Sequence, residues 1–120
     1  MTLKSDCLFC KIIEGKIPSK KVFEDEDMLA FHDINPAAQV HFLIIPKVHI
    51  DNLYDGDLRY SQILGKILGM AGQLAKEQGA DDGFRVIINN GRVGKQEVYH
   101  LHMHVLAGPE PLRSSVKPTV

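Results

Sequence analysis

The sequence predicts an α+β domain in which one long and one short helix pack on a five-stranded antiparallel sheet. Three observations predict this class. One long segment has apolar residues at helical spacing, five short apolar or alternating segments end at turn residues, and helices and strands do not alternate regularly. A chain of 120 residues can bury one core, so we expect a single domain over residues 1–120.

The N-terminal half begins with a short helix. We expect Ser5 or Asp6 to cap it, Ile13 to lie at its end and Gly15 to stop it. Three strands follow, and the acidic turn between the first two, at residues 24–27, is expected to be a solvated loop tip. These strands are predicted at residues 21–24, 28–34 and 40–45.

The longest helix is predicted at residues 58–78, with Asp57 near its cap and Gly79 just past its end. Each glycine inside a helix costs about 1 kcal/mol relative to alanine. This helix contains several, so we expect it to lie very close to another backbone, either the sheet or a second subunit. The glycines are Gly65, Gly69 and Gly72, and the apolar stripe is Ile63, Leu64, Ile67, Leu68, Ala71, Leu74 and Ala75.

The last two strands are predicted at residues 84–89 and 97–106, with a turn that starts at Asn89-Asn90-Gly91. Several prolines from residue 108 onward predict an irregular tail.

Composition narrows the classes of function. The net charge is −1, which disfavours duplex nucleic acid as a partner. The longest apolar runs are only four residues, so no transmembrane helix and no membrane partner are expected, and the N-terminus lacks the apolar core of a secretory signal. Cys7 and Cys10 lie too close together for a disulfide framework, which favours a reducing, cytoplasmic location.

Three histidines at every second position are the most informative pattern in the chain. In the stretch His100-Leu-His102-Met-His104-Val-Leu106 they alternate with apolar residues. On a strand the imidazoles would line one exposed face about 6.7 Å apart. Such a row can titrate near neutrality, bind metal or attack phosphorus.

From the residues alone, several other sites allow more than one interpretation. The loop at residues 91–97 lacks the spacing of a Walker loop, but its backbone could hold one phosphate, or it could be an ordinary hairpin turn. Asp33, at a strand end, could accept ribose hydroxyls, although beginning a turn is the more frequent role. Cys7 and Cys10 could be a redox pair, half a zinc site or buried thiols. His32 and His41 are expected to be surface or strand-edge residues.

The histidine stretch resembles the signature of the histidine triad (HIT) superfamily, in which histidines alternate with apolar residues. Further segments resemble its Hint branch, the histidine triad nucleotide-binding proteins. The resemblance spans about residues 7–108 in the expected order. Its main segments are residues 7–18, 29–34, 41–50 and 94–100.

The resemblance implies hydrolysis of purine nucleoside 5′-phosphoramidates, with AMP or GMP as product and no organic cofactor. His102 matches the nucleophile that forms a nucleotidyl-histidine, His104 the residue on the phosphate, and His100 a supporting position. It also implies a homodimer whose sheets join. Structural zinc in some members implies a ligand set of Cys7, Cys10, His49 and His100; the alternative is an empty site with reduced thiols.

The resemblance also implies the substrate contacts. Asp33 matches the ribose-binding aspartate, Phe31 and Ile34 border the base, and Asn89 matches a residue on the sugar-phosphate side. The phosphate-side loop matches Lys95, Gln96 and Glu97. Lys95 stands where many relatives have glycine, Glu97 where many have a serine, and residues 107–109 also depart from the pattern, which leaves the leaving group open.

Three other functions remain open to test. They are a dinucleoside polyphosphate hydrolase of the related Fhit type, a nucleotide- or metal-responsive module with little turnover, and a three-histidine zinc enzyme. The last is disfavoured because same-face strand residues lie too far apart for one tetrahedral ion.

Overall fold

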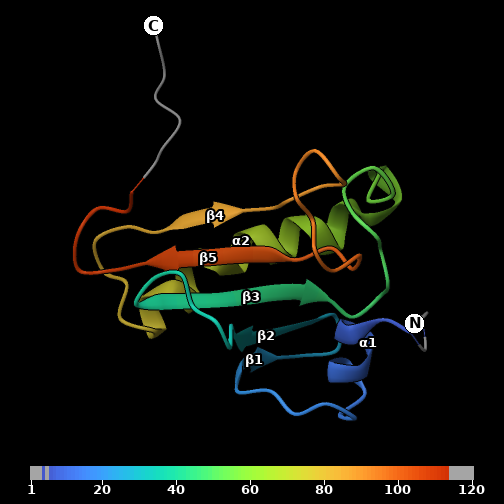
Figure 1. The fold of residues 1–120 in the computed structure, drawn as a ribbon, viewed down its shortest axis with the longest axis horizontal. Coiled ribbons are helices and arrows are strands. Elements are labelled where there is room, and N and C mark those ends of the chain that lie inside the picture. The colour runs from blue at the N-terminus through green and yellow to red at the C-terminus, as the bar shows by residue number, and fades with distance from the viewer. Residues whose placement is uncertain (1–3, 5, 114–120) are drawn as a thin grey trace, which may run out of the picture.

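The computed structural model describes residue 4 and residues 6–113. Its five-stranded sheet has the order β1-β2-β3-β5-β4, and all neighbouring strands are antiparallel (Figure 1). This confirms the predicted fold class. The elements are α1 (Leu8–Ile13), β1 (Lys21–Glu24), β2 (Met28–His32), β3 (Val40–Pro46), the 3-10 helix η1 (Leu58–Tyr60), α2 (Ser61–Glu77), β4 (Arg85–Ile87) and β5 (Met103–Ala107).

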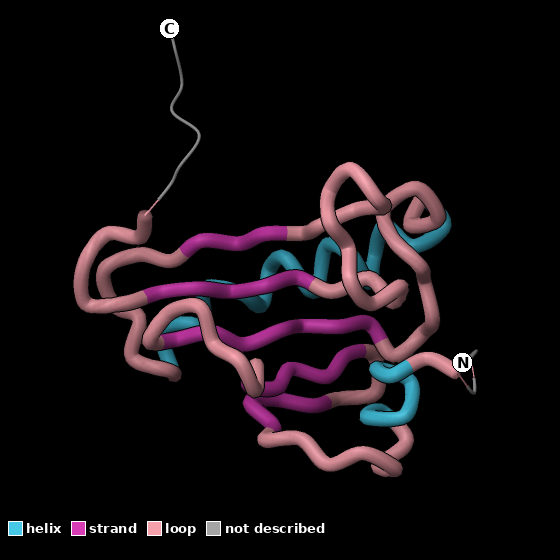
Figure 2. The backbone as a smooth tube through the Cα atoms, in the orientation of Figure 1, coloured by secondary structure: helices cyan, strands magenta, loops and turns pink. Residues whose placement is uncertain are grey.

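The sheet is covered on both faces. Helix α2 packs behind β3, β5 and β4, while α1 lies against the other face near β1 and β2 (Figures 1 and 2). Because successive strand residues point to opposite faces, Phe42 and Ile44 pack under α2, whereas Leu43 and Ile45 pack under α1. Burial on both sides explains why β2 and β3 are almost continuously apolar.

The last strand is shorter than predicted. It begins at Met103 and not at residue 97, so His100 and His102 precede it. The ladder with β3 extends only to the pair Ile44 and Met103. Pro46 would pair two residues further on, but it has no N–H to donate, and its carbonyl accepts a hydrogen bond from the His100 ring instead (2.8 Å).

The alternation of side chains survives, but the predicted exposure of the histidine row is wrong. Leu101, Met103 and Val105 are buried on one side, and on the other His100 is 0% and His102 6% exposed. The ring of Phe9 in α1 packs edge-on against both imidazoles, with centroids 6.0 Å and 5.0 Å away. Helix α1 therefore covers the face of the histidine segment that the sequence predicted to be exposed.

The cap of α1 also differs from the prediction. The sulfur of Cys7 accepts the hydrogen bond from the Cys10 amide (3.2 Å), so Cys7 caps the helix in place of Asp6. Ser5 lies outside the described residues. Gly15 follows the helix with φ +81°, which confirms it as the stop.

The acidic turn after β1 is more than a solvated loop tip. Lys66 of α2 contacts Asp25 (2.7 Å) and Asp27 (2.9 Å), which ties the turn to the helix. These contacts lower the pKa of Asp25, mainly through the hydrogen bond from Lys66.

The long helix is a 3-10 turn followed by α2. Asp57 caps the turn through the Arg59 amide (2.9 Å), close to its predicted role, and Gly79 ends the segment with φ +92°. Within the described chain, a Cβ at Gly65 or Gly69 would meet no atom within 4 Å. The sheet is therefore not the close neighbour that these two glycines predicted.

The ends of β2 and β4 also differ from the predicted bounds. Strand β2 stops at His32 because the Asp33 side chain starts a turn by accepting from the Asn35 amide (2.8 Å). Strand β4 is shorter than the predicted 84–89, and its three residues pair with Leu106, Val105 and His104 of β5. Residues 108–113 form no helix or strand, as the predicted tail requires, and residues 114–120 lie outside the described part. No helix in the described residues is long and apolar enough to cross a bilayer.

Candidate functional site

A cavity of about 430 Å³ lies on the face of the sheet that α1 covers. Its walls come from α1, the end of β2, β3, the loop before β5 and β5 itself. The expected substrate residues line it, with the exception of Gln96: Phe31, Asp33, Ile34, Asn89, Lys95, Glu97, His102 and His104. The tertiary structure thus gathers residues from four separate segments of the chain into one pocket.

His102 is held as a neutral imidazole with a defined tautomer. Its Nδ1 lies 2.8 Å from the His100 carbonyl oxygen, which can only accept, so Nδ1 carries the proton. Burial lowers the pKa of His102, while the negative charges of Asp33 and Glu97 partly oppose this effect. Its Nε2 therefore has a free lone pair at neutral pH, as a nucleophile requires.

His104 has the opposite tautomer, because a buried histidine on β3 fixes it. The Ala37 amide donates to Nδ1 of His41 (2.9 Å), so the neutral His41 ring carries its proton on Nε2 and can donate to Nδ1 of His104 (2.9 Å). The Nε2 atom of His104 then carries a proton. Burial, together with smaller effects of the nearby His102 and His41, lowers the pKa of His104 to about 4.

His41 is a functional candidate that the sequence reasoning missed. The prediction that it lies at the surface is wrong: it is 7% exposed, and burial lowers its pKa against the charge of Asp33. Its Nε2 also lies 3.4 Å from Asp33 Oδ2. A histidine inside the otherwise apolar run at residues 40–45 was the available signal. His32, which was also expected to be peripheral, lines the cavity.

Asp33 begins a turn and also lines the cavity. Its Oδ1 accepts from the Asn35 amide and forms the turn, while Oδ2 faces His41. The residue lines the cavity at the same time. Turn formation thus orients the carboxylate and does not exclude a ligand contact.

The side chain of Gln96 stabilises the loop at residues 91–97 through hydrogen bonds. Its Oε1 accepts from the Asn52 side chain (3.1 Å) and the Gly91 amide (2.8 Å), and its Nε2 donates to the carbonyls of Asp51 (2.6 Å) and Val98 (3.0 Å). The backbone amides of Lys95 and Gln96 also donate within the loop. This loop therefore presents side chains to the cavity, while those two amides are already used.

Gly94 and Lys95 give the loop its tight path. A Cβ at Gly94 would lie 2.6 Å from the Asn90 carbonyl oxygen, so only glycine fits there. Lys95 has φ +59°, a conformation that side chains rarely adopt. The exposed lysine is held in this strained position at the edge of the cavity.

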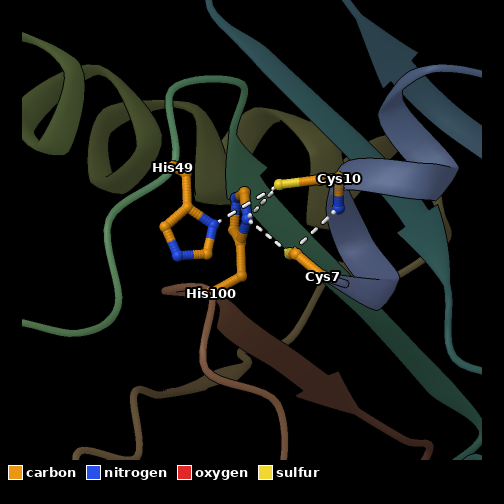
Figure 3. Close-up of side chains that lie close together, drawn as sticks. All are labelled: Cys7, Cys10, His49 and His100. Carbon is orange, nitrogen blue, oxygen red and sulfur yellow. Dashed lines mark hydrogen bonds between the residues drawn. The ribbon is translucent and has the colours of Figure 1, made fainter. Parts of the chain in front are cut away.

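Two cysteines and two histidines form a separate cluster next to the cavity. Figure 3 shows Cys7 and Cys10 from the start of α1 facing His49 from the loop after β3 and His100 from the segment before β5. Nδ1 of His100 lies 3.4 Å from Cys7 Sγ and 3.5 Å from Cys10 Sγ, and Nδ1 of His49 lies 3.4 Å from Cys10 Sγ. Two ligands of one tetrahedral zinc ion, one nitrogen and one sulfur, lie about 3.5 Å apart.

The imidazoles of this cluster are already in the tautomer that a metal needs. Nε2 of His100 donates to the Pro46 carbonyl (2.8 Å), and Nε2 of His49 donates to Asp51 (2.7 Å), so both Nδ1 atoms are free to coordinate. Burial raises the pKa of Cys10 to about 11. The donor set, its spacing and its outer partners fit a four-coordinate metal ion.

The other arrangements of histidines do not fit a metal. Nε2 of His41 and Nδ1 of His104 are 2.9 Å apart, closer than the roughly 3.3 Å expected for two nitrogens on one tetrahedral ion, and they make a hydrogen bond. The three histidines of the motif turn to different partners: thiols, a carbonyl and His41. This geometry argues against a three-histidine zinc centre.

Comparison with known proteins gives one family. The model of the "HIT domain" family matches residues 14–110. The "14 kDa zinc-binding protein" of Zea mays is 50% identical over 106 residues, 87% of this chain and 83% of that protein. The "Purine nucleoside phosphoramidase" of Escherichia coli (strain K12) is 43% identical over 107 residues, 88% of this chain and 90% of that one. A histidine triad protein from Clostridium difficile superposes with a TM-score of 0.88 at 47% identity, covering 95% of this chain and all of the other.

Proposed function

The chain belongs to the HIT domain family, and on this premise we propose that it hydrolyses purine nucleoside 5′-phosphoramidates through a covalent intermediate on His102. One observation carries the proposal. Within one cavity, His102 offers an unprotonated Nε2 and the adjacent His104 a protonated one. A nucleophile beside a proton-bearing donor is what substitution at an anionic phosphorus requires.

The proposed reaction has two substitutions at the same phosphorus. Nε2 of His102 forms a bond to the α-phosphorus, the P–N bond to the amine breaks with its electron pair, and the departing nitrogen takes up a proton from solvent. Water then attacks the nucleotidyl-histidine, loses a proton, and releases the nucleoside monophosphate and neutral His102. In both steps the Nε2–H of His104 can donate to a phosphate oxygen, where negative charge is greatest.

The cavity wall suits a nucleoside 5′-phosphate. Asp33 can accept the ribose hydroxyls, and Phe31 and Ile34 offer apolar surface to a purine base. Asn89 and Lys95 would lie on the sugar-phosphate side, where the ammonium can balance the phosphate charge. This assignment predicts that AMP and GMP bind as products.

The first experiment looks for the covalent intermediate. Protein quenched during turnover of adenosine 5′-phosphoramidate should carry a nucleotidyl group on the peptide that spans residues 100–105, as read by mass spectrometry. A wild-type protein that hydrolyses no fluorogenic phosphoramidate would refute the proposal. Faster turnover of diadenosine polyphosphates would assign the Fhit type of activity instead, and nucleotide binding without turnover would assign a regulatory module.

We also propose that the Cys7, Cys10, His49 and His100 cluster holds a structural zinc ion. The ion would join α1 to the segments that follow β3 and precede β5, and the zinc-binding name of the maize relative supports the assignment. Elemental analysis should give about one zinc per chain in the wild type and none in Cys10→Ser. If catalysis depends on His102, activity should survive a chelator that leaves the protein folded.

The predicted homodimer remains a proposal. Strand β4 lies at an edge of the sheet with Val86 37% exposed, and Gly65 and Gly69 on α2 leave room for a second backbone. Light scattering during size-exclusion chromatography should give twice the chain mass, and a monomer at all concentrations would contradict the idea.

A further inference from the structure

Glu97 stands on the rim between two hollows. It lines the cavity described above and also an adjoining open hollow of about 560 Å³ beside the Cys/His cluster. Leu8 and Val98 line both hollows as well, so the two adjoin along this rim. A group that leaves the cavity on this side passes the carboxylate of Glu97.

The charge of Glu97 is free to act on a ligand. In the described part of the chain its carboxylate makes no ion pair and no hydrogen bond, and the residue is exposed. The other carboxylate on the cavity wall, Asp33, is already engaged with the Asn35 amide and with His41.

The hollow beyond the rim is acidic. Besides Glu97 it contains Asp6 and Asp51, with Lys4 as its one lysine or arginine among the described residues. Asp51 is paired with His49 (2.7 Å) and lies 3.8 Å from Lys4. Lys95, the basic residue on the cavity wall, has no ion pair with Glu97 and remains available to the phosphate.

We propose that Glu97 selects the charge of the departing amine. Phosphoramidates whose amine carries a second, cationic ammonium group are the preferred substrate class, whereas anionic leaving groups are disfavoured. The inference rests on the proposed phosphoramidase function and adds to it the identity of the leaving group. It also gives a physical reason against polyphosphate leaving groups, because a nucleoside polyphosphate would carry its negative charge past the same carboxylate.

The test uses three adenosine phosphoramidates that differ only in the far end of a four-carbon amine. They are made from 1,4-diaminobutane, butylamine and 4-aminobutanoate, whose free ends are cationic, neutral and anionic at pH 7.5. The readout is kcat/KM for each with wild type, Glu97→Gln and Glu97→Lys. Glu26→Gln, which removes an exposed carboxylate from the β1–β2 turn, controls for net charge.

The wild type should prefer the cationic amine to the anionic one. Charges about 7 Å apart at a wet rim change each rate about three- to five-fold, so their ratio should be about ten-fold. Glu97→Gln should reduce this ratio to a few-fold at most and Glu97→Lys should invert it, while Glu26→Gln should keep it. The ratio should also shrink as salt rises from about 0.05 M to 0.5 M, because ions screen the rim.

The failures are distinguishable. If none of the three compounds is hydrolysed, the proposed function fails and this inference fails with it. If the butylamine compound is hydrolysed but the cationic-to-anionic ratio is the same in wild type and Glu97→Gln, the function stands and the role of Glu97 is overturned. A wild-type preference for the anionic amine would overturn it as well.

Discussion

His100 and His102 are two residues apart on the same side of one segment, yet they serve different sites. His100 is fully buried with Nδ1 facing two thiols, whereas His102 lines an open cavity. The difference follows from which nitrogen meets a carbonyl. The Pro46 carbonyl accepts a hydrogen bond from Nε2–H of His100, and the His100 carbonyl accepts one from Nδ1–H of His102. The backbone around each ring, and not the motif itself, decides which nitrogen is left to bind or attack.

The largest expected effect separates these two histidines. His102→Ala should lower kcat by at least about 10⁴-fold, since loss of a catalytic nucleophile or its partner residues costs about 10⁴- to 10⁶-fold. It should cost less stability than the change at His100, because His102 lines an open cavity. His100→Ala leaves the Pro46 carbonyl without its partner and opens a buried gap, so it should cost about 3 kcal/mol in the free energy of unfolding. Urea unfolding and steady-state kinetics on both variants measure this. Equal losses of activity and stability in the two would remove the distinction.

Zinc should stabilise the protein through the cluster that contains His100, and this effect should not depend on His102. Free zinc at about a hundred times its dissociation constant should add about 3 kcal/mol to the free energy of unfolding of the wild type. Cys10→Ser should show no such gain, whereas His102→Ala should gain as much as the wild type. Thermal unfolding with and without zinc provides the measurement, and an equal shift in Cys10→Ser would contradict the ligand assignment.

Acid should destabilise the folded protein because the buried His104 in the cavity resists protonation. Its pKa is about 4 in the folded protein and near 6.5 when unfolded, so the unfolded state binds more protons between these values. This histidine alone should therefore lower the free energy of unfolding by about 2 kcal/mol as the pH drops from 6.5 to 4.5. His100, whose pKa burial also lowers to about 4, adds to the fall. Urea midpoints should show a shallower slope in His104→Asn, and an unchanged slope would assign the effect elsewhere.

The smallest expected effect concerns His41, the histidine that the sequence did not identify as part of the site. His41→Phe removes the donor that fixes the His104 tautomer, so kcat should fall about ten-fold with little change in KM. His41→Gln, whose amide can still donate, should recover part of the loss. His32→Gln is a matched control, because it changes a cavity histidine that has no described link to His104. A rise in KM alone would give His41 a role in binding and not in positioning.

The local sequence predicted the elements well where one pattern dominates. The strands predicted at residues 21–24 and 40–45 and the helical stripe around Ile67 and Leu74 lie close to the strands and helix of the structure. Errors occurred where long-range pairing decides the boundary. Residues 97–102 have a strand-like pattern, but Pro46 on the neighbouring strand cannot continue the ladder.

The candidate site divides in the same way. The residue types and spacing, together with the family resemblance, named all the residues of the Cys/His cluster and about half of the cavity wall. They missed His41, because its role depends on a diagonal contact with His104 across two strands that lie 63 positions apart in the chain. They also placed Gln96 on the substrate, although its side chain is used by four hydrogen bonds beneath the loop.

By itself the sequence determined the chemical groups, their order and the faces on which they alternate, because these follow from side-chain chemistry and the two-residue period of an extended chain. Only the tertiary structure decided their burial, their tautomers and their partners. Those depend on backbone carbonyls and helix α1, which come from distant parts of the chain and reach the histidines only after folding.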